Sequence, residues 1–249
     1  MSGPGGRGSV SYAFVSIGEV RNHPASVIRS RPWLALVACV VAAASLLAAP
    51  ALSSHTAATA SAQSCPQAEL IFARGRIEAP GAGVIGNNLI SAIRNKSDKD
   101  IDLYAVQYPA DTEIDVGAND MSSRIQDMAA RCPDTRLVLG GYSLGAAVTD
   151  IVLAAPIAAF GFDKPLPPGM DRHIAAVALF GNGAAWVGPI TNFSPLYRER
   201  TIELCHGADP ICNPADPNTW ENNWPDHAAR AYVDAGMVNQ AADFIVGRI

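Results

Sequence analysis

The chain has 249 residues, of which 49% are hydrophobic and 16% are charged, with 18 basic and 23 acidic side chains. This composition excludes a disordered chain, and the net charge of −5 argues against nucleic-acid binding. Residues 1–62 hold four arginines and one glutamate, which leaves 14 basic against 22 acidic residues and a net charge of −8 in the remainder. We therefore expect no nucleic-acid partner.

The amino-terminal residues have the plan of an export signal. Arginines precede an apolar run at 33–49, and small residues follow it up to Ala62. We predict that residues 1–62 are a signal peptide and pro-region, removed or disordered, and that residues 63–249 form one domain. The protein is then secreted, with cell-wall association left open. An uncleaved anchor is the alternative, although the apolar run is barely long enough to span a bilayer.

Strand and helix patterns alternate along the rest of the chain. Short apolar runs predict buried strands at residues 69–73, 101–106, 136–140, 173–180 and 201–204. Apolar residues at helical spacing predict helices at residues 86–95, 116–131, 144–155 and 238–249. This alternation favours an α/β fold with a mainly parallel sheet that is covered by helices on both faces.

The cysteines support export. Cys39 falls within the predicted signal peptide, and the remaining four suggest two disulfides. Of the three ways to pair them, we favour Cys205–Cys212 with Cys65–Cys132, because the first pair brackets a short loop that contains a proline. Free thiols or a metal site are the alternatives. We expect no metal, since no cysteine pair has the C-x2-C spacing of zinc sites.

A candidate nucleophile lies between a predicted strand and a predicted helix. The pentapeptide Gly-Tyr-Ser-Leu-Gly at 141–145 has the G-x-S-x-G pattern of a nucleophile elbow, with Ser143 at its centre. Glycines on either side let the backbone pass closely while the serine hydroxyl points outward. The amino terminus of the following helix then faces developing negative charge. A glycine-rich turn with an incidental serine is the alternative.

A serine hydroxyl is a poor nucleophile unless a base removes its proton. In enzymes with a nucleophile elbow, the acid and then the histidine base follow the serine in the chain. His173 opens a strand, which makes it a strand-end residue. His206 lies only three residues from Asp209, so the two could not easily align behind the serine. His227, in a polar loop, is left as the predicted base.

The predicted acid is Asp209. It follows the strand at 201–204 and lies inside the short Cys205–Cys212 loop, which would hold its carboxylate still. Asp216 and Asp226 remain rivals for this role.

Four features together resemble the cutinases, most closely the secreted cutinase-like esterases of mycobacteria and related actinobacteria. They are the segments CPQAELIFARG, GGYSLGAAV and CHGADPIC, and a histidine at the expected distance after the last of these. The resemblance implies a single-domain, lidless α/β-hydrolase fold with a central five-stranded parallel sheet. It implies hydrolysis of carboxylic esters with no metal or cofactor. It also implies the disulfides Cys65–Cys132 and Cys205–Cys212 and a triad of Ser143, Asp209 and His227.

Two positions depart from the family pattern. Members often have Ser or Thr where this chain has Arg76, and Gln where it has Leu144. We expect the backbone amides of both residues to bind the oxyanion, since only the N–H groups are needed. Arg76 would then be free to engage an anionic group such as a lipid phosphate. The alternative is that it faces solvent or pairs with Glu78.

The predicted function is a serine esterase that acts through an acyl-serine intermediate on short- to medium-chain acyl esters or on lipids. One alternative is an acetylxylan-esterase-like polysaccharide deacetylase. Another is a secreted surface- or lipid-binding protein that keeps the fold with weak catalysis. We expect a small-molecule or lipid ester as substrate, a monomer, and peripheral contact with lipid or cell wall as an open point.

Overall fold

The computed structural model describes residues 64–213 and 220–249. The predicted signal peptide and pro-region, Cys39, and the rival acid Asp216 lie outside these residues. Among the described residues, no helix has both the length and the hydrophobicity that crossing a membrane requires.

Five parallel strands form one sheet in the order β2-β1-β3-β4-β5. The strands are β1 (Ala68–Ala73), β2 (Ile101–Ala105), β3 (Arg136–Tyr142), β4 (Ile174–Phe180) and β5 (Thr201–Leu204). β1 and β4 are buried along their whole length, as expected for central strands whose two faces are both covered. The predicted strands and the mainly parallel sheet are confirmed.

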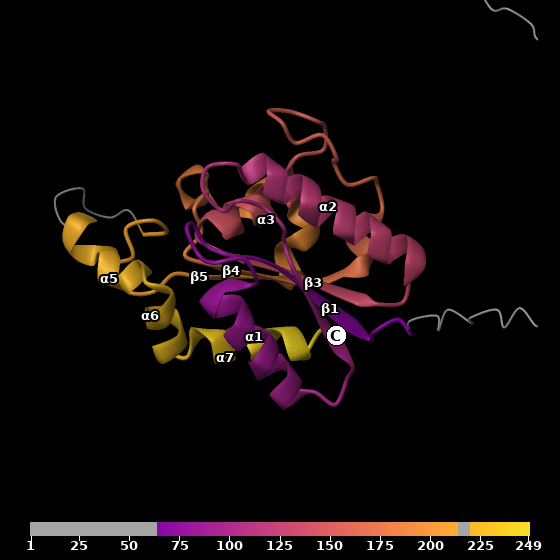
Figure 1. The fold of residues 1–249 in the computed structure, drawn as a ribbon, viewed down its shortest axis with the longest axis horizontal. Coiled ribbons are helices and arrows are strands. Elements are labelled where there is room, and N and C mark those ends of the chain that lie inside the picture. Colours follow the sequence, from indigo (N-terminus) through magenta and orange to yellow (C-terminus); the bar gives the residue numbers. More distant parts are fainter. Residues whose placement is uncertain (1–63, 214–219) are drawn as a thin grey trace, which may run out of the picture. The chain divides into compact units, whose positions relative to one another are not determined.

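Helices cover both faces of this sheet (Figure 1). The long ones are α1 (Gly83–Lys96), α2 (Ile114–Arg131), α3 (Leu144–Ala154) and α7 (Met237–Val246). Side chains alternate along β1, so Leu70 and Phe72 pack with α1 and α7 while Ile71 and Ala73 pack with α2 and α3. One apolar core therefore lies on each side of the sheet, which is the three-layer arrangement that the sequence predicts.

The helix ends differ from the predicted ones. α1 begins at Gly83, three residues early, where the carboxylate of Glu78 accepts a hydrogen bond from the amide of Val84 at 2.8 Å. α7 ends at Val246, before Gly247. The carboxylate that caps α1 comes from Glu78, which lies before the helix. Because no local sequence pattern predicts such a contact, the sequence does not place the first residue of α1 correctly.

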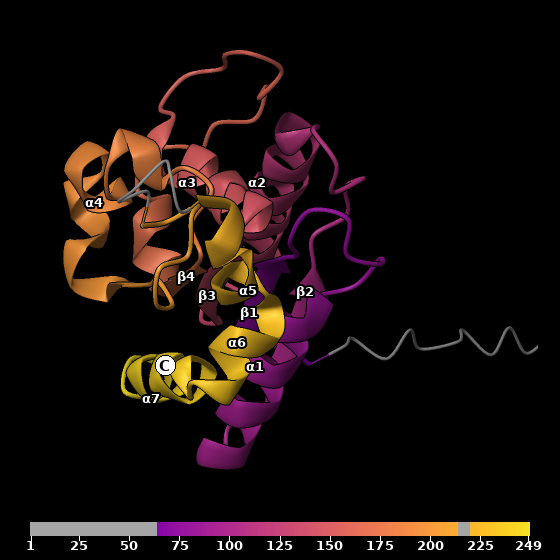
Figure 2. The ribbon, with the colours of Figure 1, turned by 90° about the vertical axis from the view of Figure 1, so that its left-hand side faces the viewer.

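Short helices on either side of β4 and after β5 are missing from the prediction. They are η1 (Met170–His173), which precedes β4, and then η2 (Ala185–Val187), α4 (Ile190–Phe193), η3 (Pro195–Arg200), η4 (Trp220–Asn223), α5 (Trp224–His227) and α6 (Ala229–Asp234). Each has six residues or fewer, which is too short for helical periodicity to be visible. They matter because α5 lies in front of the carboxyl ends of the strands (Figure 2). In parallel α/β sheets, ligands bind at the carboxyl ends of the strands.

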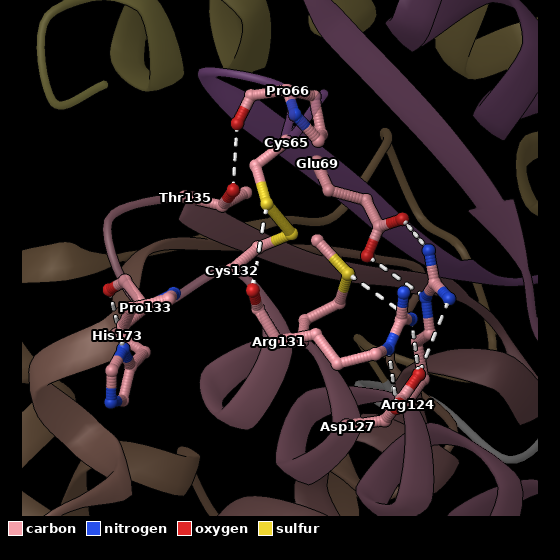
Figure 3. Close-up of a disulfide and its surroundings, with 11 residues drawn as sticks. Cys65, Pro66, Glu69, Arg124, Asp127, Arg131, Cys132, Pro133, Thr135 and His173 are labelled. Atoms are coloured by element: carbon pink, nitrogen blue, oxygen red, sulfur yellow. Dashed lines mark hydrogen bonds and ion pairs between the residues drawn. A yellow bond between two sulfur atoms is a disulfide. The ribbon is translucent and has the colours of Figure 1, made fainter. Parts of the chain in front are cut away.

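A disulfide fixes the opposite end of β1 (Figure 3). Cys65 and Cys132 are bonded across 67 residues, which ties the segment before β1 to the end of α2. Next to them the hydroxyl of Thr135 donates to the carbonyl of Pro66 at 2.6 Å. The carboxylate of Glu69, only 1% exposed, pairs with the guanidinium of Arg124 on α2. The disulfide, the hydroxyl and the ion pair together hold the start of β1 in register.

The two disulfides should differ in their effect on stability. Replacing Cys65 and Cys132 together by Ser should lower the free energy of unfolding by about 4 kcal/mol, because this bridge closes a long loop in the unfolded chain. The Cys205–Cys212 bridge spans only 7 residues, so the matched double replacement should cost about 2 kcal/mol. Denaturant unfolding of both variants measures this, and a larger loss from the short bridge would contradict it.

Candidate active site

Ser143 occupies a strained turn between β3 and α3. Its φ of 55° and ψ of −115° lie where residues other than glycine rarely occur. A Cβ atom on Gly141 would lie 2.1 Å from the carbonyl oxygen of Gly145, and one on Gly145 would lie 2.0 Å from the carbonyl oxygen of Ala73. The turn therefore requires both glycines of the pentapeptide.

Hydrogen bonds from β4 and the residues after it hold this turn. The amide of Ser143 donates to the carbonyl of Phe180 at 2.8 Å, and the amide of Gly183 donates to the carbonyl of Ser143 at 3.0 Å. The serine hydroxyl thus has a fixed position at the amino terminus of α3.

The imidazole of His227 is bonded at both ring nitrogens. Nε2 lies 2.8 Å from the hydroxyl of Ser143, and Nδ1 lies 2.7 Å from a carboxylate oxygen of Asp209. The structure thus brings the three residues of the predicted triad together. The predicted polar loop at His227 is wrong, because the residue ends the short helix α5.

Aromatic side chains fix the orientation of this imidazole. The ring of Tyr142 stacks on it with centroids 5.3 Å apart, and its hydroxyl donates to the backbone carbonyl of His227. Trp224 meets the imidazole edge-on at 5.5 Å. Both contacts restrict rotation of the ring, which keeps Nε2 directed at the serine.

The carboxylate of Asp209 is fully buried, and both of its oxygens accept hydrogen bonds. One oxygen accepts from His227 and from the hydroxyl of Tyr232 at 2.5 Å, and the other accepts from the amide of Ile211 at 2.7 Å. Burial raises the pKa of this carboxyl, but the three hydrogen bonds outweigh burial and hold the pKa below its usual range. The Cys205–Cys212 disulfide closes the loop that carries Asp209. The carboxylate therefore stays charged behind the imidazole.

The rival acid Asp226 and the rival histidines His206 and His173 make structural contacts away from Ser143. Asp226 accepts from the amide of Ala208 at 2.8 Å and lies 3.5 Å from Nδ1 of His206, so these two residues brace the Asp209 loop. Nδ1 of His173 lies 3.1 Å from the carbonyl of Pro133, in the residue just before β4. Neither histidine approaches the serine through any contact in the described chain.

The loop after β1 carries Arg76 beside the serine turn. The guanidinium of the buried Arg74 anchors this loop by donating to the carbonyls of Glu78 at 2.9 Å and Tyr108 at 2.6 Å. Glu78 bonds backbone amides, and Arg76 instead lies 3.7 Å from Asp111 with both side chains mostly exposed. Of the two alternatives for Arg76, pairing with Glu78 is therefore wrong, whereas a side chain that faces solvent agrees with the structure. The oxyanion roles of the Arg76 and Leu144 amides stay predictions.

A cavity of about 550 Å³ begins at Leu144, next to the serine turn. Its walls are apolar except for Asp150, and they include Ile151, Trp186 and Phe193. Asp150 is absent from the predicted site residues. The signal for it in the sequence is a charge in the middle of the apolar helix LGAAVTDIVLA.

Tyr232 is also absent from the predicted site residues. It follows His227 by five residues, but only the fold brings its hydroxyl to Asp209.

Within residues 64–213 and 220–249, no group of three or more His, Cys, Asp or Glu side chains could hold a metal ion.

The chain is similar to several curated proteins. "Probable carboxylesterase Culp2" of Mycobacterium tuberculosis is 69% identical over 185 residues, covering 74% of this chain and 80% of that protein. "Phospholipase Culp4" of the same organism is 48% identical over 224 residues, covering 88% of this chain and 93% of that protein.

Solved structures share the fold. A Trichoderma reesei cutinase in complex with a phosphonate inhibitor superimposes with a TM-score of 0.57 at 25% identity, covering 74% of this chain and 76% of that chain. The catalytic core of a Trichoderma reesei acetyl xylan esterase gives a TM-score of 0.58 at 22% identity, covering 75% of this chain and all of that chain, and shows the fold alone.

A family model supports the same assignment over the whole domain. The model described as cutinase matches residues 64–249. The chain therefore belongs to the cutinase family of carboxylic ester hydrolases and has the α/β-hydrolase fold of that family.

Proposed function

We propose that the chain is a secreted serine carboxylesterase that transfers an acyl group to Ser143 and then to water. The observation that supports this most directly is the unbroken line of hydrogen bonds from Ser143 through His227 to Asp209. The apolar segment near the amino terminus and the two disulfides support export.

In the first step His227 removes the proton from Ser143 while the hydroxyl oxygen attacks the ester carbonyl. Nε2 is free to accept this proton because Nδ1 donates to Asp209. The buried carboxylate of Asp209 stabilises the resulting imidazolium. The proton then passes to the leaving alcohol, which departs and leaves an acyl-serine.

The amides of Leu144 and Arg76 would hold the oxyanion. Leu144 is the first residue of α3, so its N–H group has no partner within the helix and points toward developing negative charge. Loss of one oxyanion donor typically costs about 2.7–4 kcal/mol of transition-state stabilisation. In the second step His227 activates a water molecule, which releases the acid and restores the serine.

The apolar cavity beside Leu144 supports acyl esters of short to medium chain length, or lipids, as substrates. The names of the relatives, a probable carboxylesterase and a phospholipase, point in the same direction. An acetylated polysaccharide is less suited to apolar walls. Weak catalysis by a surface-binding protein remains the competing proposal, and the variants below distinguish it.

Replacing Ser143 by Ala should lower kcat for p-nitrophenyl butyrate by about 10⁴-fold or more, because the nucleophile is removed. The folded protein should be unchanged, as judged by circular dichroism and thermal unfolding. An organophosphonate should label the parent protein and not the variant. Equal labelling of both would place the nucleophile elsewhere.

Arg76 should favour anionic substrates. Its partner Asp111 is exposed and 3.7 Å away, and such surface pairs are weak, so the guanidinium is available to a phosphate. Arg76→Thr should lower the ratio of phospholipid to neutral acylglycerol hydrolysis by about fivefold. Arg136→Thr, at an exposed arginine that begins β3, is the matched control. An unchanged ratio in Arg76→Thr would exclude this role.

Tyr232 should position Asp209 and keep it ionised. Burial and the nearby Asp209 carboxylate raise the pKa of the Tyr232 phenol, which therefore keeps the proton that it donates. In Tyr232→Phe the Asp209 carboxyl loses a donor to its charged form, so its pKa rises. We expect kcat to fall about tenfold and the acid-side loss of kcat/KM to begin at a higher pH. A pH profile identical in shape to that of the parent protein would show that Tyr232 only packs.

A further inference from the structure

The segment that follows β4, residues 181–184, touches both Ser143 and His227. The amide of Gly183 donates to the carbonyl of Ser143 at 3.0 Å. At Gly181, where φ is 52°, an added Cβ atom would lie 3.2 Å from Cε1 of His227. A shift of this segment would therefore change how the hydroxyl of Ser143 and Nε2 of His227 lie relative to each other.

A side-chain hydrogen bond fastens the same segment to α3. Asn182 is 3% exposed, and its side-chain amide donates to Oδ2 of Asp150 at 2.8 Å. The side-chain carbonyl of Asn182 accepts from the backbone amide of Ala184 at 2.9 Å. The side chain of Asn182 therefore ties the backbone of its own segment to the carboxyl group of Asp150.

The segment after β4 is thus bonded to α3 at two levels. Ser143 is the residue before the first residue of α3, and Asp150 follows it by seven residues, which is about two helical turns. Gly183 bonds the segment to Ser143, and Asn182 bonds it to Asp150. A segment held at one point can rotate about that point, whereas a second bond fixes its angle to the helix.

The carboxyl group that makes the second bond is costly to bury. Asp150 is 7% exposed, and its Oδ1 has no hydrogen-bond partner in the part of the chain that the structure describes. Burial raises the pKa of this carboxyl to about 7, although the hydrogen bond from Asn182 opposes the rise. An apolar side chain would avoid the cost of burying a polar atom without a partner. A carboxyl at this position therefore points to a role other than stability.

We propose that Asp150 is a positioning residue, whose hydrogen bond to Asn182 fixes the segment after β4 and so keeps Nε2 of His227 in contact with the hydroxyl of Ser143. The role rests on the proposed esterase function, but one of its two tests does not depend on turnover. Asp150 acts through Asn182 and touches no reacting atom. Any side chain at this position that accepts from the amide of Asn182 should therefore serve.

The first test compares Asp150→Ala, which removes the acceptor, with Asp150→Asn, whose amide oxygen still accepts from Asn182. The substrate is p-nitrophenyl acetate, because Asp150 lies about 10 Å along α3 from Ser143, beyond the reach of an acetyl group. Asp150→Ala should lower kcat by about tenfold and change KM by less than about twofold, because a misplaced reacting group costs turnover more than binding. Asp150→Asn should keep about the kcat of the parent protein, which would show that the bond matters and the charge does not.

Ser122→Ala is the matched control for the loss of a buried hydrogen bond. Ser122 of α2 is fully buried, and its hydroxyl donates to the carbonyl of Lys164. This variant should be less stable than the parent protein but should have the same kcat. Thermal unfolding verifies that each variant is folded, and Asp150→Leu replaces Asp150→Ala if the latter does not fold. A parent-like kcat in folded Asp150→Ala, or an equal loss in Asp150→Asn, would overturn the proposal.

The second test measures the nitrogen chemical shift of His227 Nε2 in isotope-labelled protein. This shift reports whether Nε2 accepts a hydrogen bond from Ser143, and Ser143→Ala gives its value when the bond is absent. The shift in Asp150→Ala should move toward the Ser143→Ala value, and the shift in Asp150→Asn should stay at that of the parent protein. An Nε2 shift in Asp150→Ala identical to that of the parent protein would contradict the positioning role.

The two proposals fail in different ways. Absence of ester hydrolysis that depends on Ser143 contradicts the esterase function, and the chemical shift still decides whether Asp150 positions the imidazole. Hydrolysis by the parent protein, together with an unchanged kcat and an unchanged shift in Asp150→Ala, contradicts the positioning role alone.

Discussion

The site depends on one constraint: the imidazole of His227 must be hydrogen-bonded at both ring nitrogens at once. Its partners come from segments far apart in the sequence, Ser143 after β3 and Asp209 after β5. Because all strands are parallel, both segments leave the sheet at the same edge. The imidazole arrives at that edge on α5. The strand order thus brings Asp209, His227 and Ser143 to one place.

Supporting residues limit how far each partner can move. The Cys205–Cys212 disulfide and the hydroxyl of Tyr232 hold Asp209, while Tyr142 stacks on the imidazole of His227. Tyr142 directly precedes Ser143, so the turn that carries the serine also orients the imidazole of His227. Close backbone contacts at the two neighbouring glycines make this turn intolerant of larger residues. A preorganised site of this kind has little reorganisation to undergo during reaction.

Much of this could be predicted from sequence because it leaves local patterns. Apolar runs reveal buried strands such as β1 and β4, and the pentapeptide around Ser143 reveals the turn. Asp209 could be singled out because its short loop is bounded by cysteines. The resemblance to a family then implied the fold and the ester chemistry, which the comparisons confirm.

The remainder could not be predicted because it depends on contacts between distant segments. Tyr232 lies in a short helix without periodicity, and only the packing of its ring against Tyr142 and Phe180 brings its hydroxyl to Asp209. Arg76 and Asp111 lie in two different loops, one after β1 and one before α2, and they meet only because the fold brings these loops together. Asp150 is different: a lone carboxylate in an apolar helix is visible in the sequence, yet its place in the wall of the cavity appears only in the fold.

The low-field proton resonance of the His227 Nδ1–H group in isotope-labelled protein tests the central constraint most directly. It is assigned by its absence in His227→Gln. The account predicts that this resonance persists in Ser143→Ala, where the bond to Asp209 is intact, and disappears in Asp209→Ala. The same resonance in folded Asp209→Ala protein would contradict the account, because the imidazole would then be oriented by another group.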